Sequence, residues 1–224
     1  MRIVLLGPPG VGKGSLASWC ERRLGVAHIS TGEIFRQEMA RKSALGRRVQ
    51  GYVTKGRLVP DALVVKVMAA RLGRSLTSKG FVLDGFPRTR GQAVGLDGVL
   101  SRHRCGLDGA VYLEAPQATL VRRLGGRRVC PACGTNYHLR TMRPARAGRC
   151  DRCGTALIIR KDDRPGTIRK RLTIDRAAAK PLVRYYERRG VLYRVDGSGK
   201  LNRVFASLAG LIERQGWMAR GRRD

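Results

Sequence analysis

The chain has 224 residues, 42% of them hydrophobic and 28% charged, a composition that is typical of a globular protein and excludes intrinsic disorder. A formal net charge of +30 would suit a protein of nucleic acid or of membrane surfaces. Most of the 46 basic residues are Arg, however, and they are spread through nearly every segment, as a compositional bias of the source genome would also produce.

No run of the sequence approaches the roughly 20 apolar residues of a membrane span. The start of the chain also lacks the pattern of a secretory signal. We therefore expect a cytoplasmic protein that makes no use of a membrane. Any binding of nucleic acid is expected to be non-specific and to follow from charge alone.

Short apolar runs alternate with helical segments along the chain. Their continuous Val, Leu and Ile content is typical of strands that are buried on both faces of a parallel sheet. These predicted strands are residues 2–7, 26–30, 80–86, 109–115 and 193–197. The alternation predicts an α/β fold with ligands at the carboxyl ends of the strands.

The first predicted strand runs directly into GPPGVGKGS, residues 7–15. Its spacing from Gly7 to Gly12 and Lys13 is that of a phosphate loop, in which bare N–H groups cradle phosphates and the lysine reaches the β- and γ-phosphates. An ordinary glycine-rich turn is the alternative, but the strand before it and the amphipathic segment after it provide the required context. The hydroxyl that usually follows the lysine comes one residue later, as Ser15.

Two insertions interrupt the alternation, a helical one at residues 30–59 and another at 126–163. The second carries two C-x2-C pairs at zinc-ligand spacing, with the members Cys130, Cys133, Cys150 and Cys153. Four thiolates with no open position predict one structural zinc ion, although iron could bind the same sulfurs. Two disulfides are the alternative, which a reducing compartment disfavours.

The remaining cysteines, Cys20 and Cys105, have no partner pattern and are expected to be buried or half-buried. The basic stretch after Trp217 is expected to be a frayed end.

These features together resemble a bacterial adenylate kinase of the zinc-lid type, over nearly the whole chain. The segments that carry the resemblance are GPPGVGKGS (7–15), ISTGEIFR (29–36), GRLVPD (56–61), FVLDGFPRT (81–89), GRRVCPACGTNYH (126–138), CDRCG (150–154), RKDD (160–163), RKRL (169–172) and KPLVRYY (180–186).

The resemblance implies the P-loop nucleoside monophosphate kinase fold with two inserted mobile subdomains. A core of residues 1–29, 60–125 and 164–224 would carry an AMP-binding insertion at 30–59 and a zinc-binding lid at 126–163. It further implies a monomer that converts ATP and AMP to two ADP with Mg²⁺.

Site residues are carried over on the same basis. The resemblance assigns catalysis to Lys13, Asp84, Arg88, Arg123, Arg160 and Arg171. It assigns ATP binding to Gly10, Val11, Gly12, Lys13, Gly14, Ser15, Arg127, Asn136, Tyr137 and Gly199. It assigns AMP binding to Thr31, Arg36, Arg57, Leu58, Val59, Gly85, Phe86, Pro87, Arg88, Gln92, Arg160 and Arg171. Asp84 matches the acid that organises the waters of the magnesium ion.

The chemistry of these residues supports the assignment. Phosphoryl transfer needs positioning and the cancellation of charge on phosphate oxygens, which Lys, Arg and Mg²⁺ provide. Asp84 ends an apolar strand, where an acid is costly unless it meets a cation.

Some residues depart from the family's pattern. Glu33 stands where Asp is usual, Asp175 replaces a common Tyr, and Ala179 replaces a common Thr. An acidic residue that usually occurs near Gly166 is missing. These departures concern packing and closure near the lid hinge.

Two other functions fit parts of the sequence. A UMP/CMP kinase shares the phosphate loop and the DGFPR stretch, but generally has a short lid, whereas this insertion is long and Thr31 favours AMP. A zinc-ribbon protein that binds nucleic acid would fit the cysteines and the charge, but the phosphate-binding residues are intact.

Overall fold

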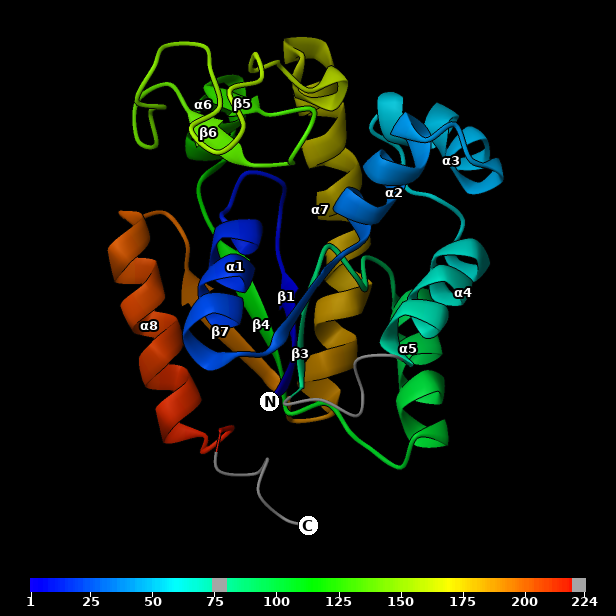
Figure 1. Ribbon diagram of the computed structural model, residues 1–224. Coiled ribbons are helices and arrows are strands. Elements are labelled where there is room, and N and C mark those ends of the chain that lie inside the picture. The colour runs from blue at the N-terminus through cyan, green and yellow to red at the C-terminus, as the bar shows by residue number, and fades with distance from the viewer. Residues whose placement is uncertain (74–79, 219–224) are drawn as a thin grey trace.

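The computed structural model describes residues 1–73 and 80–218. A parallel five-stranded sheet in the order β2-β3-β1-β4-β7 forms its centre (Figure 1). Its strands are β1 (Arg2–Leu6), β2 (Ala27–Ser30), β3 (Phe81–Asp84), β4 (Gly109–Glu114) and β7 (Leu192–Asp196). The predicted parallel sheet is therefore confirmed, with strand ends that differ slightly from those expected.

The sheet is buried on both faces, as its apolar runs predict. Successive side chains of a strand point to opposite faces. In β1, Ile3 and Leu5 join one hydrophobic cluster and Val4 and Leu6 join another, and all of them are buried. A strand with two buried faces has no place for polar residues, so its sequence shows no alternation.

The helices form layers on the two faces of the sheet (Figure 1). Helices α1 and α8 pack into the first cluster and helices α4 and α5 into the second, while the long α7 contributes to both. Their bounds are α1 (Lys13–Leu24), α4 (Asp61–Leu72), α5 (Arg90–Arg102), α6 (Gln117–Gly125), α7 (Pro165–Arg188) and α8 (Leu201–Arg214).

Residues 30–59 contribute two helices, α2 (Thr31–Ala40) and α3 (Ala44–Thr54), which pack on each other. Ser30 and Ser43 cap them, because their hydroxyls accept from the N–H groups of Glu33 and Gly46. Side-chain oxygens at these positions satisfy N–H groups that a helix start leaves without a partner. The predicted helical insertion is confirmed.

Residues 126–163 contain an antiparallel pair of short strands, β5 (Arg127–Val129) and β6 (Asn136–His138). A short 3-10 turn, η1 (Lys161–Asp163), leads from them into α7. Figure 1 shows this segment and the α2–α3 pair on either side of the start of α7, beyond the carboxyl ends of the strands. The predicted domain boundaries and the mobility of both segments stay predictions.

The last described residues of the chain, after α8, pack against the sheet. Trp217 is 1% exposed and packs edge-on against Tyr193 of β7. The predicted frayed end beyond it falls largely on residues 219–224, which lie outside the described residues. Of the helices in the described part of the chain, none is long and apolar enough to cross a membrane.

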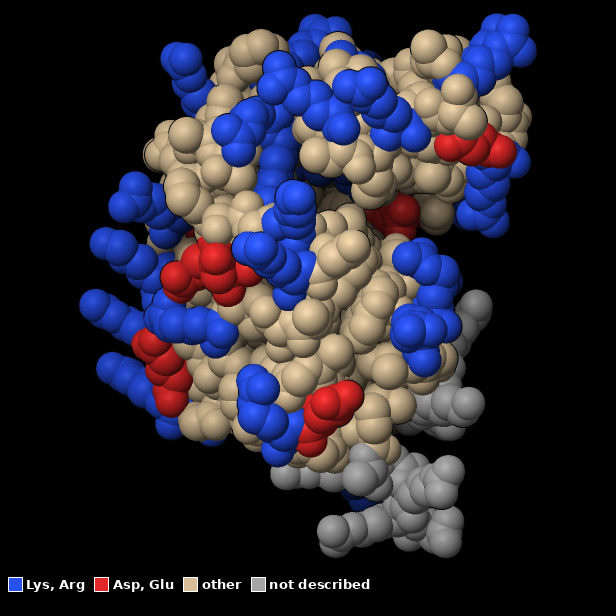
Figure 2. Space-filling view, turned by 90° about the vertical axis from the view of Figure 1, so that its left-hand side faces the viewer, with Lys and Arg blue, Asp and Glu red and all other residues tan. Residues whose placement is uncertain are grey.

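Basic side chains are scattered over the face that carries α8, with few acidic ones between them (Figure 2). This distribution agrees with the spread of Arg along the sequence.

Candidate active site

The phosphate-loop segment forms a tight turn between β1 and α1. Gly7 has φ 126°, and a Cβ atom there would lie 2.3 Å from the carbonyl oxygen of Leu113. Gly12 has φ 112° at the N-cap of α1, where no side chain caps the helix. The first N–H groups of α1 therefore remain available, and the helix dipole makes that end attractive to an anion.

Lys13 folds back over this loop. Its Nζ donates to the carbonyl oxygens of Gly7 at 2.6 Å and Pro8 at 3.0 Å. Burial lowers the pKa of Lys13 to about 8, against the charges of Asp84 and Asp175, which raise it. The amine is thus held at the mouth of the loop by two carbonyl oxygens and lies near two carboxylates.

Asp84 ends β3 beside the loop. Its Oδ2 lies 3.8 Å from Nε2 of His28 and 3.2 Å from the place that a Cβ on residue 14 would take. Because residue 14 is a glycine, the space in front of the Asp84 carboxylate stays open. Burial would raise the pKa of Asp84, but the His28 contact and the charges of Lys13 and Arg88 outweigh it and hold the pKa below its usual value.

A cleft of about 310 Å³ opens above the loop, and we call it the phosphate cleft. Every residue predicted to bind ATP lines it, from loop residues 10–15 to Gly199. The wall from residues 126–163 consists of Arg127, Asn136, Tyr137, His138, Thr141, Met142 and Arg160. Of the predicted catalytic residues, Lys13, Asp84, Arg88, Arg123, Arg160 and Arg171 all lie on it.

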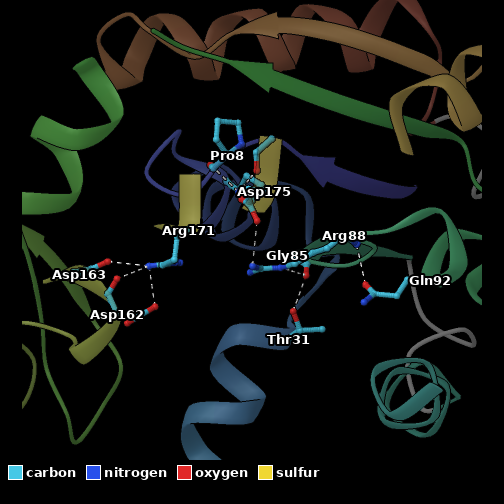
Figure 3. Close-up of polar contacts among 11 residues, drawn as sticks. Pro8, Thr31, Gly85, Arg88, Gln92, Asp162, Asp163, Arg171 and Asp175 are labelled. Carbon is cyan, nitrogen blue, oxygen red and sulfur yellow. Dashed lines mark hydrogen bonds and ion pairs between the residues drawn. The ribbon is translucent and has the colours of Figure 1, made fainter. Parts of the chain in front are cut away.

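Buried acids form ion pairs with two arginines of the phosphate cleft, Arg127 and Arg171. Arg127 donates to Asp163 through Nε at 2.6 Å and through Nη2 at 2.5 Å. Arg171 lies 2.9 Å from the Asp162 carboxylate and 3.0 Å from that of Asp163 (Figure 3). The side chain of Asp163 is 0% exposed. The acid pair therefore fixes both guanidinium groups at the base of the lid segment.

Arg160 is held differently. Its Nη2 donates to Oδ1 of Asn136 at 2.5 Å, while its Nε is buried without a hydrogen-bond partner. Burial, together with the charges of Arg36 and Arg127, lowers its pKa from the usual value of a guanidinium group. The unpartnered Nε–H of Arg160 and the positive charges of Arg36 and Arg127 around it both favour the binding of an anion at this place.

A smaller pocket of about 70 Å³ lies between α2, α3 and the end of β3, and we call it the helical pocket. Thr31 Oγ1 donates to the carbonyl oxygen of Gly85 at 2.8 Å at its edge (Figure 3). The pocket is lined by most residues predicted to bind AMP, namely Thr31, Arg36, Arg57, Leu58, Val59, Gly85, Arg88, Gln92 and Arg171.

Three predicted AMP residues lie elsewhere. Phe86 is 1% exposed in the hydrophobic core, Pro87 lines a separate cavity beside the loop, and Arg160 lies on the phosphate cleft. Arg123 is engaged as well, because it donates to the carbonyl oxygens of Gly197, Ser198 and Gly199 at 2.6 to 2.9 Å. Its phosphate-facing role stays a prediction.

The four lid cysteines gather at one point. All of their sulfur atoms lie within 4.8 Å of one another, and none of the four is in a disulfide. Tyr137 donates from its hydroxyl to the sulfur of Cys150 at 3.4 Å, and this hydrogen bond lowers the pKa of that thiol to about 6. Four sulfurs this close fit the closed tetrahedral site of a structural zinc ion. The two other cysteines are placed as expected, with Cys20 buried and Cys105 half-buried.

Comparison with known proteins agrees with this geometry. The sequence model of the adenylate kinase family matches residues 5–191. The chain belongs to the adenylate kinase family. It is 44% identical to an adenylate kinase of Moorella thermoacetica, over 96% of this chain and 99% of that protein. It is 41% identical to one from Clostridium tetani, over 95% and 98%, and 40% identical to one from Clostridium beijerinckii, over 95% and 98%. The predicted family, kinase class and fold are thus confirmed.

Sequence reasoning missed several residues that hold this adenylate kinase site together. Asp162 and Asp163 stand in the quoted RKDD segment, where two adjacent acids after two basic residues were a usable signal. Asp61 accepts hydrogen bonds from Thr89 and Gln92 at 2.7 and 2.8 Å and so orients Gln92. Nothing in the local sequence links Asp61 to a residue so far along the chain.

Proposed function

We propose that the protein catalyses the reversible transfer of a phosphoryl group from ATP to AMP, which yields two ADP. One observation carries the proposal. The phosphate cleft and the helical pocket share Arg36, Arg88 and Arg171 in their walls. Two nucleotides bound in these hollows would therefore direct their phosphates at the same cations, which is the arrangement that direct transfer needs.

Different groups would bind the phosphates of ATP and stabilise the transferred phosphoryl group. The bare N–H groups at the start of α1 and the Lys13 amine would bind the phosphates of ATP. Arg88 and Arg171 would cancel the charge that spreads over the transferred phosphoryl group. Because both arginines are already oriented, by Gly85 and by the acid pair, little reorganisation remains for the moment of transfer.

Magnesium fits the same cleft. Asp84 faces the loop across Gly14, Ser15 lines the same cleft, and carboxylate and hydroxyl oxygens of this kind suit Mg²⁺. When bound, the ion would neutralise charge on the phosphate oxygens of ATP. Asp84 would orient the waters around it, while Lys13 keeps its contact with the loop.

We further propose that one zinc ion is held by Cys130, Cys133, Cys150 and Cys153 and serves stability. The compact sulfur cluster supports this. All four positions of the metal would be filled by sulfur, so no position would be open for chemistry. We also propose that the protein is a monomer of the cytoplasm, as the family resemblance implies, where a reducing environment would keep the four cysteines as thiols.

A coupled assay of ADP formation tests the reaction. Purified protein is given Mg-ATP with AMP, UMP or CMP at equal concentration. We expect turnover with AMP to exceed that with either pyrimidine nucleotide, because Thr31 and Gln92 line the helical pocket. Faster turnover of UMP or CMP would contradict the proposed substrate, and ADP formed equally without AMP would contradict the reaction.

A further inference from the structure

Asp175, on the inner side of α7, lies against one of the shared arginines. Its Oδ1 is 3.7 Å from Nη1 of Arg88, a contact drawn in Figure 3. On its other side Arg88 donates from Nε to the carbonyl oxygen of Gly85 at 2.9 Å. The guanidinium group thus lies between a carbonyl oxygen and a carboxylate.

The same carboxylate acts on the lysine of the loop. The charged groups around the Lys13 amine are Asp84, Asp175, Arg88 and Arg171, and Asp175 is one of the two that favour its charged form. A phosphate that contacts Lys13 and Arg88 together would therefore enter a space close to the negative charge of Asp175. That charge repels it.

The carboxylate also has space into which it can move. A cavity of about 310 Å³, which we call the side cavity, lies between the end of β1, the start of α6 and the inner side of α7. Asp175, Lys13 and Arg88 line both the side cavity and the phosphate cleft. Ala179, one helical turn after Asp175, lines the side cavity and fills little of it.

We propose that Asp175 is a resident counter-anion of the phosphate site, which competes with substrate phosphate for Arg88 and Lys13 and turns toward the side cavity when a phosphate binds. The inference rests on the proposed function, because it takes Lys13 and Arg88 as phosphate ligands. Asp175 is a positioning residue in this scheme. It neutralises the two cations between turnovers and lowers the affinity for nucleotide, which favours release of product.

The experiment measures anion binding directly. Tripolyphosphate, which carries no base or ribose, is titrated calorimetrically into the wild-type protein and three variants. Asp175→Asn removes the charge and keeps the shape of the side chain. Asp175→Glu keeps the charge, and the side cavity has room for one more methylene. Glu213→Gln, on the exposed face of α8, removes one negative charge far from the site.

We expect Asp175→Asn to bind tripolyphosphate about fivefold more tightly than wild type, the effect of one partly exposed ion pair. Asp175→Glu and Glu213→Gln should bind it as wild type does. In the coupled assay KM for AMP should fall by a similar factor in Asp175→Asn, while kcat does not rise. A residue with only a structural role would not tighten binding when it is removed.

Equal or weaker binding by Asp175→Asn, with tripolyphosphate bound normally by wild type, would overturn the inference and leave the proposed function intact. Equal tightening by Glu213→Gln would also overturn it, because net charge would then be the cause. Failure of the wild-type protein to bind tripolyphosphate would instead contradict the phosphate site itself.

Discussion

Arg127 and Asp163 join the two ends of the lid segment. Arg127 opens β5 and Asp163 ends the turn before α7, yet two hydrogen bonds of 2.6 and 2.5 Å connect their side chains. The base of the lid is therefore closed by an ion pair as well as by its short strands. Bending between lid and core would have to occur outside this pair, near Gly125–Gly126 and residues 164–166.

Replacing Asp163 by Asn should destabilise the fold. The carboxylate is 0% exposed and serves Arg127 and Arg171 together, so its loss leaves buried positive charge without a partner. We expect a loss of about 2 kcal/mol in the free energy of unfolding, below the usual figure for a buried pair because the Arg127 side chain is 20% exposed. Denaturant melts of Asp163→Asn and of the exposed control Glu213→Gln measure it. Equal stability of the two variants would show that the pair contributes little.

Replacing Lys13 by Met should nearly abolish catalysis. The change removes a positive charge from the transferred phosphoryl group and keeps most of the side-chain volume. We expect kcat to fall by at least about 100-fold, as for other electrostatic contacts of this kind. Lys66→Met, on the exposed side of α4, is the matched control. Near-normal turnover by Lys13→Met would mean that the loop does not bind phosphates.

The rate should also fall in alkaline solution. The charged amine of Lys13 is the form that binds phosphate, and burial lowers its pKa to about 8. Protonation is complete well below that pH and is lost as the pH rises through it. We therefore expect kcat/KM, which reports on the free enzyme, to fall by about tenfold per pH unit above pH 8. Lys13→Arg should lack this decline, whatever its absolute rate, because Arg stays charged. The same decline in that variant would assign the titration to another group.

The zinc proposal predicts a metal content and a stability change. Elemental analysis of protein purified without added metal should give one zinc per chain, and Cys150→Ser should lose most of it. Because metal binding contributes folding energy to such modules, the melting temperature should fall in that variant. Cys105→Ser, outside the cluster, should keep both. Less than half an equivalent of metal in the wild-type protein would argue against a structural site, and iron in its place would change only the identity of the ion.

Two moving parts are expected during turnover. The phosphoryl group must be kept from water and the product must leave, so residues 30–59 and 126–163 should close and open again. The lid segment carries nine basic and three acidic residues, and substrate phosphates would attract this net positive charge. Unnatural amino acids that carry spin labels, at Arg146 in the lid, Arg48 on α3 and Arg203 on α8, leave the native cysteines unchanged. Two adenosines joined by five phosphates should shorten both distances to Arg203. Unchanged distances would indicate a static lid.

Local pattern was enough to predict the sheet, the phosphate loop and the cysteine cluster. Each of these depends on residues that are close in sequence, such as the glycines around Lys13 or the two residues between paired cysteines. The assignment of nucleotide pockets needed the family resemblance, because the helical pocket combines α2, α3 and the end of β3.

Contacts between distant residues could not be predicted in this way. Asp61 orients Gln92 from another helix, and Asp175 meets Arg88 from α7. The sequence shows neither contact, since helix periodicity alone does not say which neighbour a polar side chain will meet. Arg123 illustrates the reverse case, because the family resemblance assigns it to a phosphate while its guanidinium group donates to the carbonyl oxygens of residues 197–199.

The burial of Trp217 has a consequence for folding of the chain during its synthesis. This residue lies against Gly109 at the start of β4 and belongs to the same cluster as β1 and α1. A nascent chain that stops before α8 therefore has one face of the sheet covered only in part, by α1, α6 and the start of α7. On that face β1 can complete its packing only after α8 and Trp217, which lie far later in the chain, have been synthesised.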